Sequence, residues 1–92
     1  MKKPIYDVLI NKFDTDEFLD FRSILRKQTM KGFEKYGKYL FTDDKNIDEN
    51  YALEELVDAA VYLQTLGYDD LVFKIVNIFN EVLNRKKERN LC

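Results

Sequence analysis

Residues 51–66, YALEELVDAAVYLQTL, form the most strongly helical stretch of the sequence. They are rich in Ala and Leu and contain neither Gly nor Pro, and Gly67 follows as a stop signal. Apolar side chains fall on nearly every side of this predicted helix. Helices with that pattern are mostly buried, so we expect this one to be mostly buried as well.

The segments on either side of this stretch also favour helices. Downstream, Asp69 or Asp70 is expected to cap a last helix with a wide apolar stripe and a basic end, RKKER, at residues 85–89. Upstream, the polar segment TDDKNIDEN (42–50) is expected to be a loop. Before that loop, a helix is predicted over 16–36, with Asp14 and Thr15 offering its start and Gly37 its end.

The first apolar segment, residues 5–10 (IYDVLI), is too short to decide between a helix and a strand. Short loops between helices favour antiparallel neighbours. The sequence therefore predicts one domain over residues 1–92, an all-α fold built as a small antiparallel bundle of three or four helices.

The composition of the chain excludes several kinds of functional site. The chain has no His, and Cys92 is its one cysteine, which excludes an internal disulfide and any metal site of thiolate and imidazole ligands. Any metal would therefore be held by oxygen ligands. The formal net charge of −2 does not favour nucleic-acid binding, and no apolar run is long enough to span a membrane. We expect a cytoplasmic protein.

Three acids interrupt the apolar helix at 51–66. Glu55 and Asp58 are three residues apart and share one face, and Glu54, four residues before Asp58, borders the same patch. Carboxylates on a buried or half-buried stripe need a compensating cation, and Mg²⁺ held by one or two carboxylates while bridging phosphates is one solution. The alternative is that these acids are solvated, or paired with Lys or Arg from the preceding helix.

A basic segment precedes the loop. Lys27, Lys31, Lys35 and Lys38 recur at helical spacing and could hold phosphate oxygens, while Tyr36 and Tyr39 could stack on a base. The alternative is a solvated helix face. Gly32, in the middle of this predicted helix, could permit close approach of a ligand or of another helix.

Two segments together resemble a known family. Residues 54–63, EELVDAAVYL, resemble the second metal-binding helix of the MazG-like all-α nucleoside triphosphate pyrophosphohydrolases, whose Glu-x-x-Asp motif is matched by Glu55 and Asp58. Residues 30–40, MKGFEKYGKYL, are similar to the preceding segment of small MazG-like proteins of bacteriophages and prophages. The resemblance covers about residues 26–66.

The resemblance implies a helical protein, usually a dimer or tetramer, that cleaves nucleoside triphosphates between the α and β phosphates. Acids from two neighbouring helices hold magnesium, which positions the attacking water. This chain departs from that pattern, because its helix over 16–36 lacks the Glu-Glu-x-x-Glu motif that supplies the other ligands. Glu17 and Asp20 are spaced like part of that motif, and Glu34 is a lone acid among lysines.

The leading hypothesis is a Mg²⁺-dependent nucleotide pyrophosphohydrolase, with Glu55 and Asp58 as metal ligands and Glu54 as an assisting acid. Lys31 and Lys35 would then contact phosphates, and Tyr36 the base. The alternative is a catalytically inactive helical module that binds a nucleotide or a protein. Because both later helices carry generous apolar stripes, we also expect a homo-oligomer, most simply a dimer.

Overall fold

The computed structural model describes residues 2–42 and 44–91. Within these ranges the fold is all-α, as predicted, with four α-helices, one short 3₁₀ helix and no strand. The described chain divides into two compact units, over residues 1–44 and 45–92, and each unit is described here by itself. Met1, Asp43 and Cys92 lie outside the described residues.

The first unit begins with α1 (Ile5–Lys12), so the segment left open by the sequence is a helix. The 3₁₀ helix η1 (Asp16–Phe18) leads into α2 (Leu19–Tyr36), which contacts α1. The helix expected from Asp16 thus begins as a 3₁₀ turn, and Thr15 precedes it without a side-chain cap. Phe13 follows α1 and packs its ring against two rings of the next elements. The ring centroids are 5.0 Å apart for Phe13 and Phe18 and 5.2 Å apart for Phe13 and Phe21.

The end of α2 matches the prediction. Gly37 caps the helix at φ 70°, and its N–H donates to the carbonyl of Phe33 over 2.7 Å. A left-handed residue at this position is the usual reason for glycine at a helix end. The chain then returns to the start of α1, where the Ile5 N–H donates to the Leu40 carbonyl and the Thr42 N–H to the Lys3 carbonyl.

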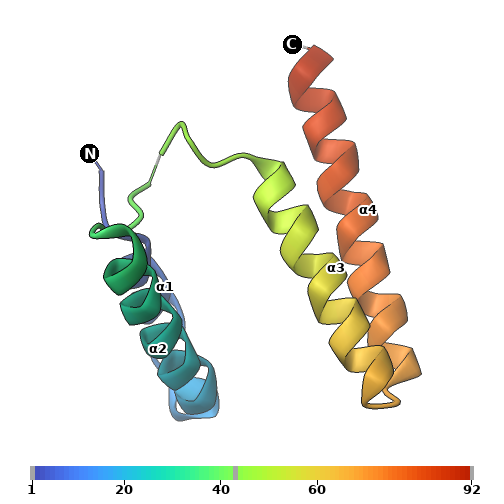
Figure 1. Ribbon diagram of the computed structural model, residues 1–92, viewed down its shortest axis with the longest axis horizontal. Helices are drawn as coiled ribbons and strands as arrows, with labels where there is room; N and C mark the ends of the chain where they lie inside the picture. Colours follow the sequence, from blue (N-terminus) through green and yellow to red (C-terminus); the bar gives the residue numbers. More distant parts are fainter. Residues whose placement is uncertain (1, 43, 92) are drawn as a thin grey trace. The chain divides into compact units, whose positions relative to one another are not determined.

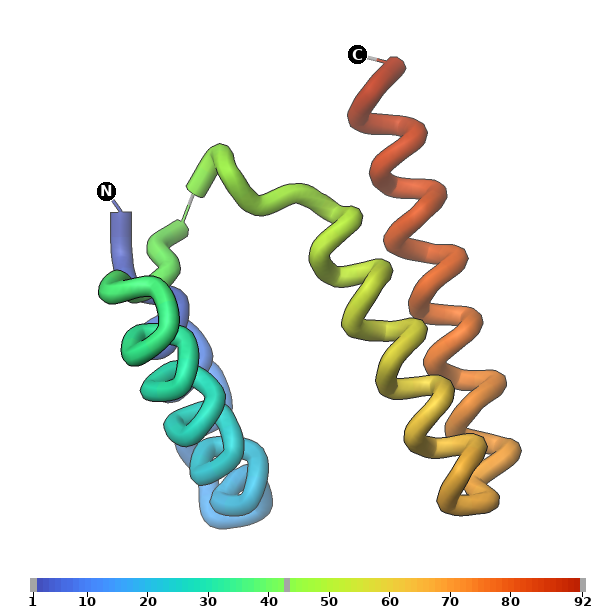
Figure 2. The backbone as a smooth tube through the Cα atoms, in the orientation of Figure 1, coloured from blue at the N-terminus to red at the C-terminus, as the bar shows by residue number. Residues whose placement is uncertain are grey.

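The second unit is a helical hairpin. It consists of α3 (Glu49–Thr65) and α4 (Asp69–Leu91), which run antiparallel and side by side (Figures 1 and 2). Asp48 caps α3 by accepting a hydrogen bond from the Asn50 N–H at 2.9 Å. Between the helices the chain turns at Gly67, whose φ is 84°. The predicted loop, stop signal and last helix are therefore confirmed, with α3 starting two residues earlier than expected.

The hairpin has a thin core. Leu53 of α3, 8% exposed, is the one buried residue within 2–42 and 44–91. Half-buried side chains repeat at helical spacing along both helices, among them Leu56 and Leu63 of α3 and Ile75 of α4. None of the described helices combines the length and apolar character that crossing a bilayer requires.

The expectation that the helix over 51–66 is mostly buried is wrong for this structure. Val57 is 49% exposed, Val61 57% and Tyr62 68%. The physical reason is geometric: within its unit α3 packs against a single helix, α4, and one neighbour can cover only part of a helix circumference.

Candidate functional site

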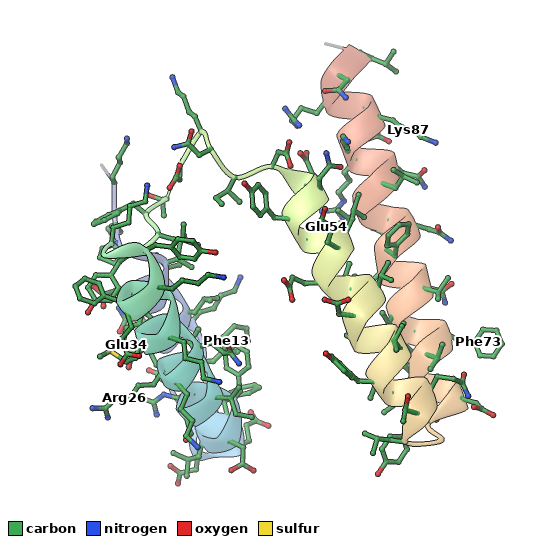
Figure 3. The ribbon with its side chains drawn as sticks, viewed as in Figure 1. Phe13, Arg26, Glu34, Glu54, Phe73 and Lys87 are labelled. Atoms are coloured by element: carbon green, nitrogen blue, oxygen red, sulfur yellow. The ribbon has the colours of Figure 1, made fainter. Side chains whose placement is uncertain are left out.

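The three acids of α3 lie together on its exposed side. Glu54, Glu55 and Asp58 are all exposed, whereas Leu53, which begins the stripe toward α4, is buried. Asp58 follows Glu55 by three residues and Glu54 by four, so its carboxylate adjoins both of theirs on the helix surface. Figure 3 labels Glu54 on α3. The sequence correctly predicted their grouping on one face.

The sequence left two environments open for these acids, a stripe with little access to water that would demand a cation, and a solvated face. Their exposure agrees with the solvated face. Exposed carboxylates remain hydrated and carry no such demand. What the arrangement offers is access, because a hydrated divalent cation can approach these exposed carboxylates from solvent without displacing any packed residue.

The structure does not gather a complete metal site. Across residues 2–42 and 44–91, no three acidic, His or Cys side chains come close enough together to hold an ion. Glu55 and Asp58 are thus at most a partial ligand set, as the missing first motif implies. Two acids of the predicted loop 42–50 are engaged in other contacts. Asp48 caps α3, and Glu49 accepts hydrogen bonds from Arg89. Asp43 lies outside the described residues.

The basic segment lies on α2, in the first unit. An open hollow along this helix is lined by three cations together with Ser23, Met30 and Glu34; the cations are Arg26, Lys27 and Lys31. Figure 3 labels Arg26 and Glu34 on α2. Three cations against one acid make this hollow a positively charged surface.

Of the predicted phosphate and base contacts, Lys31 lines the hollow on α2, while Lys35 lies over the Tyr36 ring, 5.2 Å from its centroid. Tyr36 is 66% exposed. Tyr39 stacks on Phe33, with ring centroids 4.5 Å apart, so one face of its ring is already covered. Gly32 has no atom within 4 Å of the place a Cβ would take, so no close approach explains it within the described chain.

Sequence reasoning missed two polar contacts at the end of the hairpin opposite its turn, Arg89 with Glu49 and Lys86 with Asn50, which we call the clasp. The Arg89 guanidinium donates two hydrogen bonds to the Glu49 carboxylate, at 2.7 and 2.6 Å. Beside it, Lys86 donates to the Asn50 side chain at 2.7 Å. Both contacts join the last turns of α4 to the first turn of α3. A small hollow beside this clasp is lined by Lys45, Ile47 and Asp48 together with the clasp pair itself.

The clasp gives the hairpin a defined pH dependence. The hydrogen bond from Arg89 is the main reason that the pKa of Glu49 lies below its usual value. Since the folded-state pKa is lowered, the clasp contributes stability above the ordinary glutamate pKa and loses it as the pH falls through the lowered value.

We therefore expect Glu49→Gln to lower the melting temperature at neutral pH and to reduce the loss of stability between neutral and acidic pH. Melting temperatures measured by circular dichroism across that range test this. Glu81→Gln is the matched control, because Glu81 pairs with Arg85 within α4 and joins no second helix. If both variants show the same pH dependence, Glu49 does not clasp the hairpin.

Comparison with protein family models, with curated proteins and with solved structures found no match for this chain.

Proposed function

We propose that this chain is a cytoplasmic, Mg²⁺-dependent nucleotide-handling protein that cleaves nucleoside triphosphates between the α and β phosphates. The observation that supports this most is the exposed acidic face of α3, where Glu54, Glu55 and Asp58 lie side by side and open to solvent. The resemblance of residues 26–66 to the MazG-like pyrophosphohydrolases supplies the reaction class.

In this proposal Glu55 and Asp58 bind the metal, and Glu54 acts as an assisting acid. Mg²⁺ is commonly held by one or two carboxylates while it keeps several waters and bridges to phosphate oxygens. A partial ligand set on one helix is compatible with that mode of binding. The bound ion would neutralise charge on the phosphates and orient a water for attack.

The test is pyrophosphate release. Wild-type protein with Mg²⁺ is expected to release pyrophosphate from at least one nucleoside triphosphate, and Asp58→Ala is expected to abolish that release while leaving the helical circular dichroism signal intact. Asp70→Ala is the matched control, because Asp70 is an exposed acid of the same unit on the other helix. An inactive wild type, tested with all common triphosphates, would exclude the enzyme.

A second candidate is a non-catalytic helical module that binds a nucleotide or a protein. The observation that favours it is the exposure of large apolar side chains: Tyr36 is 66% exposed, Tyr62 68% and Phe73 72%. Uncovered aromatic side chains of this kind mark interaction surfaces. Calorimetry separates the two functions, since the module binds its ligand without turnover.

A further inference from the structure

Helix α4 carries a second stripe besides the one that packs on α3. Its members recur at intervals of three and four residues, which places them along one side of the helix. The stripe consists of Asp69, Phe73, Val76, Asn80, Leu83 and Lys87. In Figure 3, Phe73 and Lys87 project from α4 on the side away from α3.

The apolar members of this stripe are poorly covered. Phe73 is 72% exposed and Val76 44%, while Leu83 is half-buried at the edge of the contact with α3. Asp69, Asn80 and Lys87 are exposed. A phenylalanine this exposed, in line with two further apolar side chains, has the composition of an interface rather than of a solvated helix face.

Two copies of the stripe complement each other when the second copy runs in the opposite direction. Suppose that two copies of α4 lie antiparallel, with the midpoint of the contact at the level of Ile78 in each helix. Asp69 of one copy then meets Lys87 of the other. Nearer the midpoint, Phe73 meets Leu83 and Val76 meets Asn80. Each of these contacts occurs twice across the twofold axis, which is the pattern of an isologous dimer.

Charge also decides the orientation. A parallel arrangement would place Asp69 against Asp69 and Lys87 against Lys87, which is repulsive at both ends. The two charges are 18 residues apart on the helix, roughly 27 Å at 1.5 Å per residue, so each ion pair forms at its own end of the contact. The Gln64 side chain donates to Asp69 at 2.8 Å and fixes that carboxylate at its end of the helix.

We propose that a second copy of this chain docks antiparallel on the stripe of α4 from Asp69 to Lys87. Phe73 is the main anchor, buried against Leu83 of the second copy. The ion pairs between Asp69 and Lys87 at the two ends of the contact set its register. The dimer concerns α4 and does not depend on the nucleotide chemistry proposed for α3.

Sedimentation equilibrium of the full chain tests this surface. The wild type is expected to be a dimer, and Phe73→Glu is expected to raise the dimer dissociation constant by at least about 100-fold, because a charge would replace the aromatic anchor. Val61→Glu is the matched control: Val61 is an exposed apolar residue, at 57%, but lies on α3, and its variant is expected to stay dimeric.

Charge exchange tests the orientation. Asp69→Lys and Lys87→Asp are each expected to weaken the dimer, and the double variant to restore it, because the antiparallel pairs form again with their charges reversed. Circular dichroism confirms that each variant remains helical. The proposal is overturned by a monomeric wild type, by a Phe73→Glu variant that still dimerises, or by a double variant that stays weaker than both single ones.

Discussion

Replacing Leu53 with alanine is expected to destabilise the hairpin of α3 and α4 more than any other single side-chain truncation in it. Leu53 is 8% exposed and is the one buried residue in the described ranges 2–42 and 44–91. Truncating a buried leucine to alanine costs about 2–5 kcal/mol, through lost transfer free energy and the cavity that remains. In a core this thin the neighbours can relax, so we expect about 2–3 kcal/mol.

Thermal melting followed by circular dichroism measures this effect. For a domain of this size the loss corresponds to a fall in melting temperature on the order of 10 °C. Protein concentration must be held constant, because dimerisation would itself stabilise the folded state. Val57→Ala is the matched control on the same helix; with Val57 49% exposed, its cost is expected to stay below about 1 kcal/mol. Equal losses in the two variants would mean that Leu53 is not the centre of the core.

Local signals in the sequence located the helices well. Gly37 and Gly67 both adopt positive φ where a helix ends, and α4 begins at Asp69, next to the predicted capping position. These features depend on a few neighbouring residues and on backbone sterics, so they can be predicted without knowledge of the tertiary fold. The start of α2 shifted to Leu19 because a 3₁₀ turn precedes it, and helix ends commonly differ by such a turn.

Burial was harder to predict than secondary structure. The apolar pattern of α3 predicts a helix covered on most sides, but burial depends on how many neighbours pack against it. Val61 and Tyr62 stay exposed because α4 is the single neighbour of α3 within the hairpin. For the same reason the grouping of Glu55 and Asp58 could be predicted, since it follows from helix periodicity, whereas their access to water could not.

The clasp between Glu49 and Arg89 shows a second limit of sequence reasoning. The two residues are 40 positions apart, and their bidentate contact depends on the register of the antiparallel hairpin. Local sequence signals place Arg89 in the basic end of the last helix and Glu49 in the loop before α3. Arg89 does lie at a helix end, whereas Glu49 is the first residue of α3, and their pairing follows only when α3 and α4 are aligned.

Substituting Gly67 with alanine is expected to destabilise the hairpin through the backbone alone. Gly67 has φ 84° and forms the turn between α3 and α4, where its N–H donates to the Gln64 carbonyl at 3.0 Å. For a residue with a Cβ, this left-handed region costs about 1–2 kcal/mol. Apart from Gly67 and its two chain neighbours, no residue has an atom within 4 Å of the position that such a Cβ would take, so steric clash adds nothing to this cost.

Gly32→Ala is the control that separates backbone strain from the general effect of adding a methyl group. Gly32 also has no atom within 4 Å of a Cβ position, but it lies inside α2 with ordinary helical geometry. There the same substitution is expected to stabilise by about 0.5–1 kcal/mol, because glycine is a poor helix former. Urea denaturation of both variants should therefore shift the midpoint in opposite directions. A shift in the same direction would show that the turn at Gly67 does not require its positive φ. The short turn that aligns α3 with α4 would then need another explanation.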